Sequence, residues 1–225
     1  MKTRLLLLFT SVLLFLSSCI EIIDDVQMNN DGSGTFKYTI NLSASKVKIN
    51  SILALDSLDG QKVPSRTEIT DRISAISKKL EVKSGISNVN IDVNMIDYVF
   101  KLQCDFSSIS ALQNAIKEIV KEESKDQQIK ELDHNWMVWD GSKLIRSIPD
   151  ITIEQTKKLK SEDIELLKQG NYTSITRFER LVDRFENDNA ILSKNKMAVM
   201  IKTNPYLLSQ SYNLLENTIY LVPNK

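Results

Sequence analysis

The chain has 225 residues, of which 42% are hydrophobic and 26% charged, and these proportions are those of an ordinary globular protein. Its 29 Lys and Arg residues balance 29 Asp and Glu residues, and the two signs are interspersed along the chain. This distribution excludes the basic patch of a nucleic-acid-binding protein and the basic cluster that draws a protein to anionic lipid headgroups.

The first 19 residues form a segment of three parts. Lys2 and Arg4 supply positive charge, residues 5–16 are almost entirely apolar, and two serines precede Cys19. This order is typical of an export signal, and its end resembles the lipobox of bacterial lipoproteins. The resemblance implies cleavage after residue 18, with a diacylglycerol on the sulfur of Cys19 and an acyl chain such as palmitate on its amine.

We therefore expect a signal peptide over residues 1–18 and a mature domain over residues 19–225 that is held on a membrane by lipid. The apolar run is too short to span about 30 Å of hydrocarbon as a helix. Because Ile20, and not Asp, follows the cysteine, we expect sorting to the outer membrane, with the protein facing the periplasm or the cell surface.

The mature chain would contain 207 residues, enough for one large domain or two small ones. Exported proteins commonly use disulfides, but the lipid would consume Cys19 and leave Cys104 without an internal partner. Stability must then come from the hydrophobic core. The best candidate for a seam between two parts is the polar stretch at residues 121–130.

A hairpin is predicted at the start of the mature region. Residues 20–28 form the first strand and residues 29–34 form a loop rich in residues that tolerate positive φ. Apolar side chains alternate with polar ones in both strands, at Ile20, Ile22, Val26 and Met28 and then at Phe36, Tyr38, Ile40 and Leu42.

Two helices are predicted next. The first covers residues 43–58 and is ended by Gly60 and Pro64. The second opens with a capping box formed by Ser65 and Glu68, and its apolar face contains Ile69, Ile73, Ile76 and Leu80.

The clearest hairpin spans residues 89–106, where two runs alternate strictly: Val89, Ile91, Val93 and Met95, then Tyr98, Phe100, Leu102, Cys104 and Phe106. Ser108 caps a helix whose apolar stripe ends at Val120. We expect this hairpin to be central, with Ile91, Val93, Phe100 and Leu102 packed beneath the helix.

Further strands and helices are predicted in the C-terminal half of the chain. A short hairpin covers residues 136–148, and a charged helix opened by Thr152 and Gln155 ends before Gly170. Strands follow at residues 172–178, 197–202 and 217–222, with a short helix or turn at residues 205–215. This order of antiparallel hairpins and helices predicts an α+β fold with the helices packed on one face.

Several of these patterns occur together in known proteins. They are Asp31-Gly32-Ser33-Gly34, Gly85-Ile86-Ser87, Ser108-Ile109-Ser110-Ala111-Leu112, Thr176-Arg177-Phe178 and Ala190-Ile191-Leu192-Ser193. The chain resembles a family of small, uncharacterised lipoproteins of Gram-negative bacteria that open with a strand–turn–strand around a D-G-S-G loop. It also resembles the LppM-type lipoprotein domain. The resemblance implies a fold and a lipid anchor, and it supplies no catalytic residue.

His134 is the single histidine and follows Asp133. A Ser-His-Asp site needs a histidine as its base, but no serine lies in a G-x-S-x-G elbow, so a structural role is expected. One histidine and one cysteine also do not make a zinc site. Cys104 lies in the apolar alternation, which predicts a buried, unreactive thiol.

The acidic clusters could suggest calcium binding or paired-carboxylate catalysis. They are Glu21 with Asp24-Asp25, Glu122-Glu123, and Glu162-Asp163 with Glu165. The loop at residues 29–34 lacks the spaced acidic ligands of a calcium loop, and the helical clusters alternate with lysine, so we expect solvated surfaces.

Two further segments could form contacts. Alternation places Trp136 and Trp139 on opposite faces, so one of them could form an exposed contact surface, although core filling is favoured. Asp56-Ser57-Leu58 resembles an acceptor for O-linked glycans in some Gram-negative periplasms.

These observations predict a lipid-anchored cell-envelope protein with a non-catalytic role in binding or assembly. Its expected partners are the membrane and an envelope protein; no nucleic acid, cofactor, metal or catalytic residue is expected. A carrier of a small molecule or lipid, with a closed apolar pocket, is the first alternative. An envelope hydrolase with a groove lined by carboxylates is the second.

Overall fold

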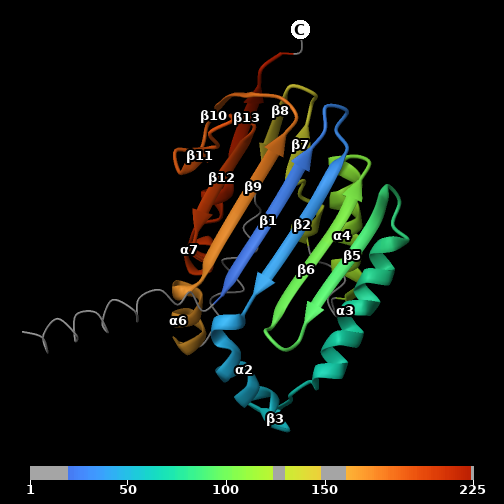
Figure 1. Cartoon of the computed structure of the whole chain (residues 1–225), viewed down its shortest axis with the longest axis vertical. Coiled ribbons are helices and arrows are strands. Elements are labelled where there is room, and N and C mark those ends of the chain that lie inside the picture. Colours follow the sequence, from blue (N-terminus) through green and yellow to red (C-terminus); the bar gives the residue numbers. More distant parts are fainter. Residues whose placement is uncertain (1–19, 124–129, 148–160, 224–225) are drawn as a thin grey trace, which may run out of the picture.

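The computed structural model describes residues 20–123, 130–147 and 161–223. Its largest element is a seven-stranded sheet made of β1 (Glu21–Met28), β2 (Gly34–Asn41), β5 (Ile86–Asn94), β6 (Val99–Phe106), β9 (Asn171–Phe178), β11 (Ala190–Leu192) and β12 (Ala198–Thr203). The order across this sheet is β11-β12-β9-β1-β2-β6-β5, so β1 is the middle strand (Figure 1).

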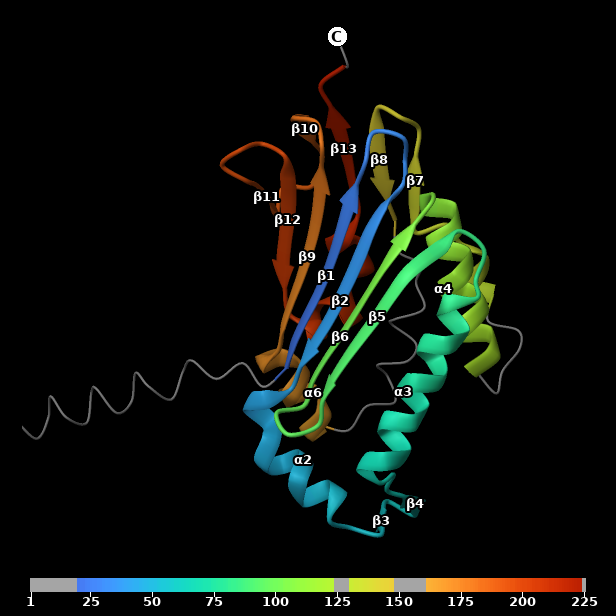
Figure 2. The same ribbon diagram turned by 45° about the vertical axis from the view of Figure 1, so that its right-hand side comes forward.

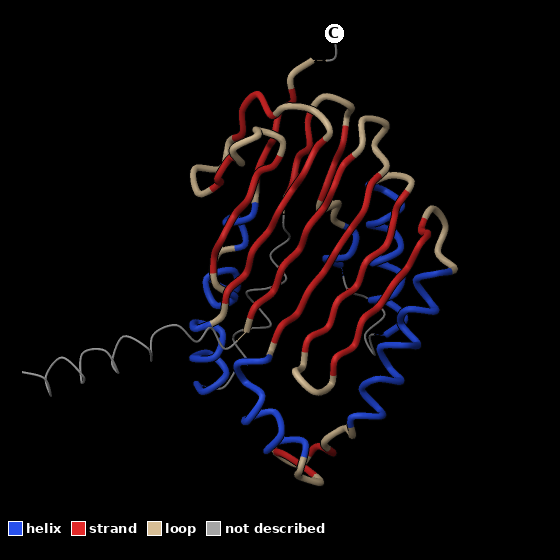
Figure 3. Tube along the Cα trace, viewed as in Figure 1, coloured by secondary structure: helices blue, strands red, loops and turns tan. Residues whose placement is uncertain are grey.

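A second sheet has four strands, β7 (Met137–Trp139), β8 (Lys143–Arg146), β10 (Val182–Phe185) and β13 (Asn217–Leu221), in the order β10-β13-β8-β7. It lies on the same side of the large sheet as α3 (Arg66–Glu81) and α4 (Ile109–Glu123), which cover the half containing β5 and β6 (Figure 2). Within the described ranges, no element covers the opposite face of the large sheet (Figure 3). The predicted α+β class is confirmed.

The described chain also contains several smaller elements. They are a 3-10 turn (Ser43–Ser45), α2 (Lys46–Leu53), β3 (Ser57–Leu58), β4 (Gln61–Lys62), a 3-10 turn (Lys130–Asp133), α6 (Ser161–Gln169), α7 (Pro205–Gln210) and a 3-10 turn (Tyr212–Leu215).

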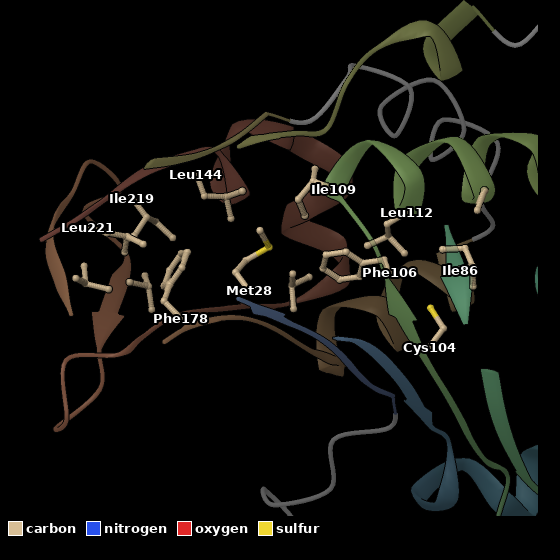
Figure 4. Packing of buried hydrophobic residues seen from close by; sticks show 14 of the residues in the cluster. Met28, Ile86, Cys104, Phe106, Ile109, Leu112, Leu144, Phe178, Ile219 and Leu221 are labelled. Carbon is tan, nitrogen blue, oxygen red and sulfur yellow. The ribbon is translucent and has the colours of Figure 1, made fainter. Parts of the chain in front are cut away.

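The hydrophobic core lies between the large sheet and the layer formed by the second sheet and α4 (Figure 4). Met28, Phe106 and Phe178 contribute from the large sheet, and Leu112 and Leu144 contribute from α4 and β8. All five are at most 5% exposed, so the two halves of the covering layer share one core.

The first predicted hairpin is confirmed as β1 and β2, which pair with Val26 opposite Phe36. Its register leaves no room at Gly34, where an added Cβ would lie 1.9 Å from the backbone oxygen of Gln27. Glycine is therefore required by close approach of the two strands.

Two of the predicted helix starts are also confirmed. Ser65 Oγ accepts from the backbone N–H of Glu68 at 3.1 Å, and the Glu68 carboxylate accepts from the backbone N–H of Ser65 at 2.7 Å. Ser108 Oγ accepts from the backbone N–H of Ala111 at 3.1 Å. Each serine satisfies an N–H group that the first helical turn leaves unpaired.

The hairpin at residues 89–106 is present as β5 and β6, but its expected central position is wrong. It lies at the edge of the large sheet, because β1 takes the middle and pairs in parallel with β9, about 150 residues later in the chain. The expected burial is also displaced along β6: Phe100 is only half-buried, whereas Cys104 and Phe106 are fully buried. The helix that packs most closely on β5 is α3.

The helix expected over residues 43–58 is shorter in the structure. After α2 the chain turns back as β3 and β4, joined through Asp59 (φ 53°) and Gly60 (φ 77°). Positive φ at both central positions is the geometry of a tight two-residue hairpin, which Asp-Gly favours over a longer helix. The short strands β10 and β11 were not predicted from the sequence.

Some predictions concern residues outside the described ranges. They include the lipidation site Cys19, the capping residues Thr152 and Gln155, and most of the proposed seam at residues 121–130. The division of the chain into a signal peptide and a mature domain therefore stays a prediction.

Candidate functional site

A buried ion pair joins the two sheets. Arg146, on β8, places its two terminal nitrogens 3.3 and 2.8 Å from the two carboxylate oxygens of Asp24 on β1. The side chains are only 14% and 7% exposed. Arg146 also donates to Ser174 Oγ, and the Tyr172 hydroxyl donates to the same carboxylate. These four residues form what we call the buried polar cluster.

The charges of this cluster compensate one another. Burial alone would raise the pKa of the Asp24 carboxyl, but the Arg146 guanidinium and hydrogen bonds from Arg146, Tyr172 and Ser174 hold it below its usual range. Burial and the nearby Asp24 carboxylate raise the pKa of Tyr172. At neutral pH Asp24 is therefore ionised, with its carboxylate oxygens already accepting hydrogen bonds, and Tyr172 is a neutral donor. Neither residue is available as a general base.

Asn217 faces Arg146 across the β8–β13 pair. Its Oδ1 accepts from the backbone N–H groups of Glu186 and Asn187 at 3.1 and 3.0 Å. Its Nδ2 has no hydrogen-bond partner, although the residue is only 6% exposed. A buried donor left unpaired costs free energy, and this amide is therefore a candidate ligand-binding group.

An open cleft of about 590 Å³ adjoins this end of the second sheet. Its lining is mostly polar and includes Arg146, Ser147, Asp188, Asn189, Asn217 and Thr218. A second cleft of about 480 Å³ shares Asn189 and Leu214 with the first and continues to Lys168 and Lys202. Together they form a polar trough that suits a hydrogen-bonding partner better than an apolar one.

Asn187 holds the wall of the first cleft in place. Its Nδ2 donates to the backbone oxygens of Leu214 and Glu216 at 3.0 and 2.7 Å. This amide and that of Asn217 bind the loop after β10 to the chain before β13, so the cleft is built on paired backbone and not on a free loop.

The apolar cavity between the sheets is very small. It encloses about 10 Å³ and is bounded by residues that include Leu144, Val199, Ile201 and Ile219. This is about the space of one water molecule, whereas small-molecule sites typically enclose hundreds of Å³.

His134 contacts a serine that the sequence did not indicate. Its Nε2 lies 2.8 Å from Ser147 Oγ, with both residues near the first cleft. Asp133, which precedes His134 in the chain, lies 3.8 Å from Lys121 Nζ. The described residues thus bring a histidine and a serine together without showing a carboxylate that orients the histidine.

The predicted burial of Cys104 is confirmed. The residue is 0% exposed, and burial raises the pKa of its thiol to about 11. Among the described residues, no group of three or more His, Cys, Asp or Glu side chains could hold a metal ion. None of the described helices combines the length and apolar character needed to cross a membrane.

The two tryptophans do not form an exposed aromatic patch. Trp139 stacks on Phe178 at 6.3 Å and joins the core, while Trp136 is half-buried under Lys117. Ser57, in the possible glycan acceptor, is exposed in β3.

The expectation that every acidic cluster is solvated is wrong for Asp24. Glu122 and Glu123 do form ion pairs near the surface, where Lys83, just after α3, and Lys79, on α3, approach them to 2.6 and 2.7 Å. Asp24, however, shares the inward face of β1 with Val26 and Met28. That parity in the sequence could have identified a buried carboxylate, and hence the need for a buried cation.

Comparison with known proteins adds one structural similarity. No protein-family model matches the chain, and no match to a curated protein is significant. The NMR structure of the folded domain of Mycobacterium tuberculosis LppM is similar with a TM-score of 0.42 and 10% sequence identity, over 92% of this chain and 91% of that one. These comparisons show no family for this chain, and the resemblance to the D-G-S-G lipoproteins stays a prediction.

Proposed function

We propose that this chain is a lipid-anchored protein of the bacterial cell envelope with a non-catalytic binding role. The observation that carries the proposal is that Cys19, at the end of a segment typical of an export signal, lies two residues before β1, the middle strand of the large sheet. The anchor would therefore join the folded body with almost no linker. Sorting to the outer membrane and membership of the D-G-S-G lipoproteins are parts of the same proposal.

The binding role is supported by the polar trough. Arg146 and Asn217 are among the residues that line its first cleft, and the loop at residues 186–189, which Asn187 and Asn217 hold in place, forms one wall. An envelope protein that presents polar backbone or side-chain groups fits such a surface. The carrier alternative receives less support, because the enclosed apolar cavity between the sheets has room for about one water molecule.

A hydrolase is the second candidate, favoured by the contact between His134 and Ser147. A serine nucleophile needs a hydrogen-bonded base, and a distance of 2.8 Å meets that requirement. Replacing His134, which does not line the first cleft, with Gln separates the two roles. If the protein binds without catalysis, a His134→Gln strain keeps the wild-type envelope phenotype; complete loss of function together with retained partner binding would favour the hydrolase.

The lipid anchor is tested with Cys19→Ala. The wild-type protein should incorporate a labelled fatty acid and remain with the membrane fraction after a high-salt wash, because two or three acyl chains anchor stably where one is marginal. The variant should accumulate as a larger, unlabelled precursor. Normal maturation and membrane retention of Cys19→Ala would disprove the lipoprotein proposal.

The binding surface is tested by photo-crosslinking in intact cells. A crosslinking amino acid at the exposed position Asp188, in the first cleft, is compared with one at Asp71, which is exposed on α3. The cleft position should give a discrete product whose partner can be identified, and Asn217→Leu should reduce its yield. Equal products from both positions would reject the trough as the binding surface.

A further inference from the structure

Exposed apolar side chains gather at one end of the molecule. The segment from residue 43 to residue 64 and the β5–β6 turn, residues 95–98, form what we call the end lobe (Figures 1 and 2). It exposes Val47 (81%), Ile96 (71%), Leu55 (47%) and Leu58 (44%). Neither α2 nor the β3–β4 hairpin has a fully buried residue, so these elements add little to the core.

The end lobe is nevertheless held firmly. Asn50 Oδ1, on α2, accepts from the Tyr98 hydroxyl and, at 2.7 Å, from the Arg66 guanidinium. Lys46 Nζ lies 3.0 Å from an Asp97 carboxylate oxygen, and Arg66 also donates to the backbone oxygen of Met95 at 3.1 Å. These contacts join α2, the start of α3 and the β5–β6 turn. The backbone that carries the exposed apolar side chains is therefore fixed to the rest of the fold.

The lobe lies at the end of the sheet where the chain enters it. Glu21 pairs with Asn41, and the backbone N–H of Leu42 donates to the Tyr98 backbone oxygen at 3.0 Å. The first described residue, Ile20, therefore shares this end with the start of α2 and with the β5–β6 turn. In Figures 1 and 2, α2 and the β3–β4 hairpin extend beyond this end of the sheet.

We infer that the end lobe docks into the phospholipid surface to which the chain is anchored. The inference rests on the proposed function, because a lipid on Cys19 places Ile20 about 3.8 Å from the anchored residue. With so short a tether, elements that extend beyond Ile20 must meet the headgroups. When the lobe meets the headgroups, its exposed apolar side chains move out of water and into the boundary between headgroups and acyl chains. Burial of this apolar surface stabilises the docked orientation.

The charged residues of the lobe indicate which forces would hold it on the membrane. The lobe lacks a cluster of unpaired basic residues: Lys46 pairs with Asp97, and Lys62 lies 2.6 Å from Glu68. Burial of apolar surface, and not attraction to anionic lipids, would hold the lobe on the membrane. Docking should therefore depend little on salt, unlike contacts made by exposed charges.

A pair of matched positions tests the inference. Val47 and Val82 are 81% and 80% exposed, and Val82 follows the other end of α3, a helix of 16 residues or about 24 Å. Val47→Cys and Val82→Cys are labelled with a fluorescent dye in the full lipidated protein. Cys104 is fully buried and does not compete for the dye.

The labelled proteins are reconstituted into vesicles of phosphatidylethanolamine and phosphatidylglycerol that contain a nitroxide-labelled phospholipid. The dye at position 47 should lose most of its fluorescence, at low and high salt alike, while the dye at position 82 keeps most of its own. Equal, weak quenching at both positions on vesicles that carry the protein would overturn the inference.

Two other outcomes are distinguishable. A dye at position 47 that is shielded from aqueous iodide but not quenched by the nitroxide lipid would mean that protein covers the lobe, which also overturns the inference. Failure of both variants to float with the vesicles would instead contradict the lipid anchor, and with it the proposed function.

Discussion

The two ends of the large sheet differ in how they are filled. At one end, the closed end, the inward side chains of β1, β6 and β9 finish at Met28, Phe106 and Phe178, all at most 5% exposed. At the other, the open end, the same strands begin at half-buried Ile22, Phe100 and Tyr172. The ion pair of Asp24 and Arg146 lies between these ends.

This difference in side-chain burial between the two ends separates the residues that stabilise the fold from those that could bind a partner. The closed end concentrates the apolar contacts that stabilise the fold, while the open end carries the chain entry, the end lobe and the polar trough. Groups at the open end can be exposed or polar because the core does not depend on them. The comparison therefore predicts large effects of substitution near Phe106 and small ones near Phe100.

The largest effect is expected at Phe106. Phe106→Ala should lower the free energy of unfolding by about 3–5 kcal/mol, through lost transfer energy and a cavity beside Leu112. Phe100→Ala, at a half-buried position of the same strand, should cost about 1–2 kcal/mol. Urea unfolding measures both, and equal losses would show that the gradient along β6 does not exist.

A comparable loss is expected from breaking the buried ion pair. Asp24→Ala leaves Arg146 buried without its partner and should cost about 3–5 kcal/mol. The double variant Asp24→Leu, Arg146→Met should recover much of that loss, because no uncompensated charge remains. If the loss of stability in the double variant equalled the sum of the losses from replacing Asp24 alone and Arg146 alone, the two side chains would not be coupled through their charges.

The same pair predicts how stability depends on pH. Because the folded pKa of Asp24 is lowered, its contribution is complete above the pKa of an unfolded Asp, about 3.9. It is lost as the pH falls through the lower folded value. The difference in unfolding free energy between wild type and Asp24→Asn should therefore be constant near neutral pH and shrink below pH 4. A difference that grows on acidification would reverse the assigned direction.

The local parts of this fold could be predicted from sequence because local chemistry determines them. Ser65 with Glu68, the cap at Ser108 and the alternation on either side of the loop at residues 29–34 all act within a few residues. The pairing of β1 with β9 could not be found in this way. It joins residues about 150 positions apart, and alternation states which face is buried without naming the neighbouring strand.

The candidate site shows the same limit. The parity of Asp24 with Val26 and Met28 indicates a buried carboxylate, and Arg146 follows the inward Leu144 by two residues. Each could be recognised alone as a charged residue on an apolar face. The contact between Asp24 and Arg146 could not be predicted from the sequence, because it depends on how the second sheet packs on the large sheet.

A smaller effect is expected at Cys104, near the closed end. Its thiol should react slowly with a thiol reagent in the folded protein and quickly after denaturation, because the side chain is buried and its pKa is raised to about 11. Cys104→Ala should change stability by about 1 kcal/mol and leave function intact. Rapid labelling of the native protein would place this part of β6 at the surface.

The smallest effect is expected on the uncovered face of the large sheet. Lys101 lies between Phe100 and Leu102 on β6 but points to the opposite side, where it is 58% exposed and 3.7 Å from Asp92. An exposed ion pair contributes little, so Lys101→Ala should change the free energy of unfolding by less than about 0.5 kcal/mol. The same urea series that includes Phe106→Ala measures it. A loss approaching that of Phe106→Ala would mean that this face is buried in solution, for example against a second copy of the chain, and a concentration-dependent midpoint would then identify the second copy as the cover.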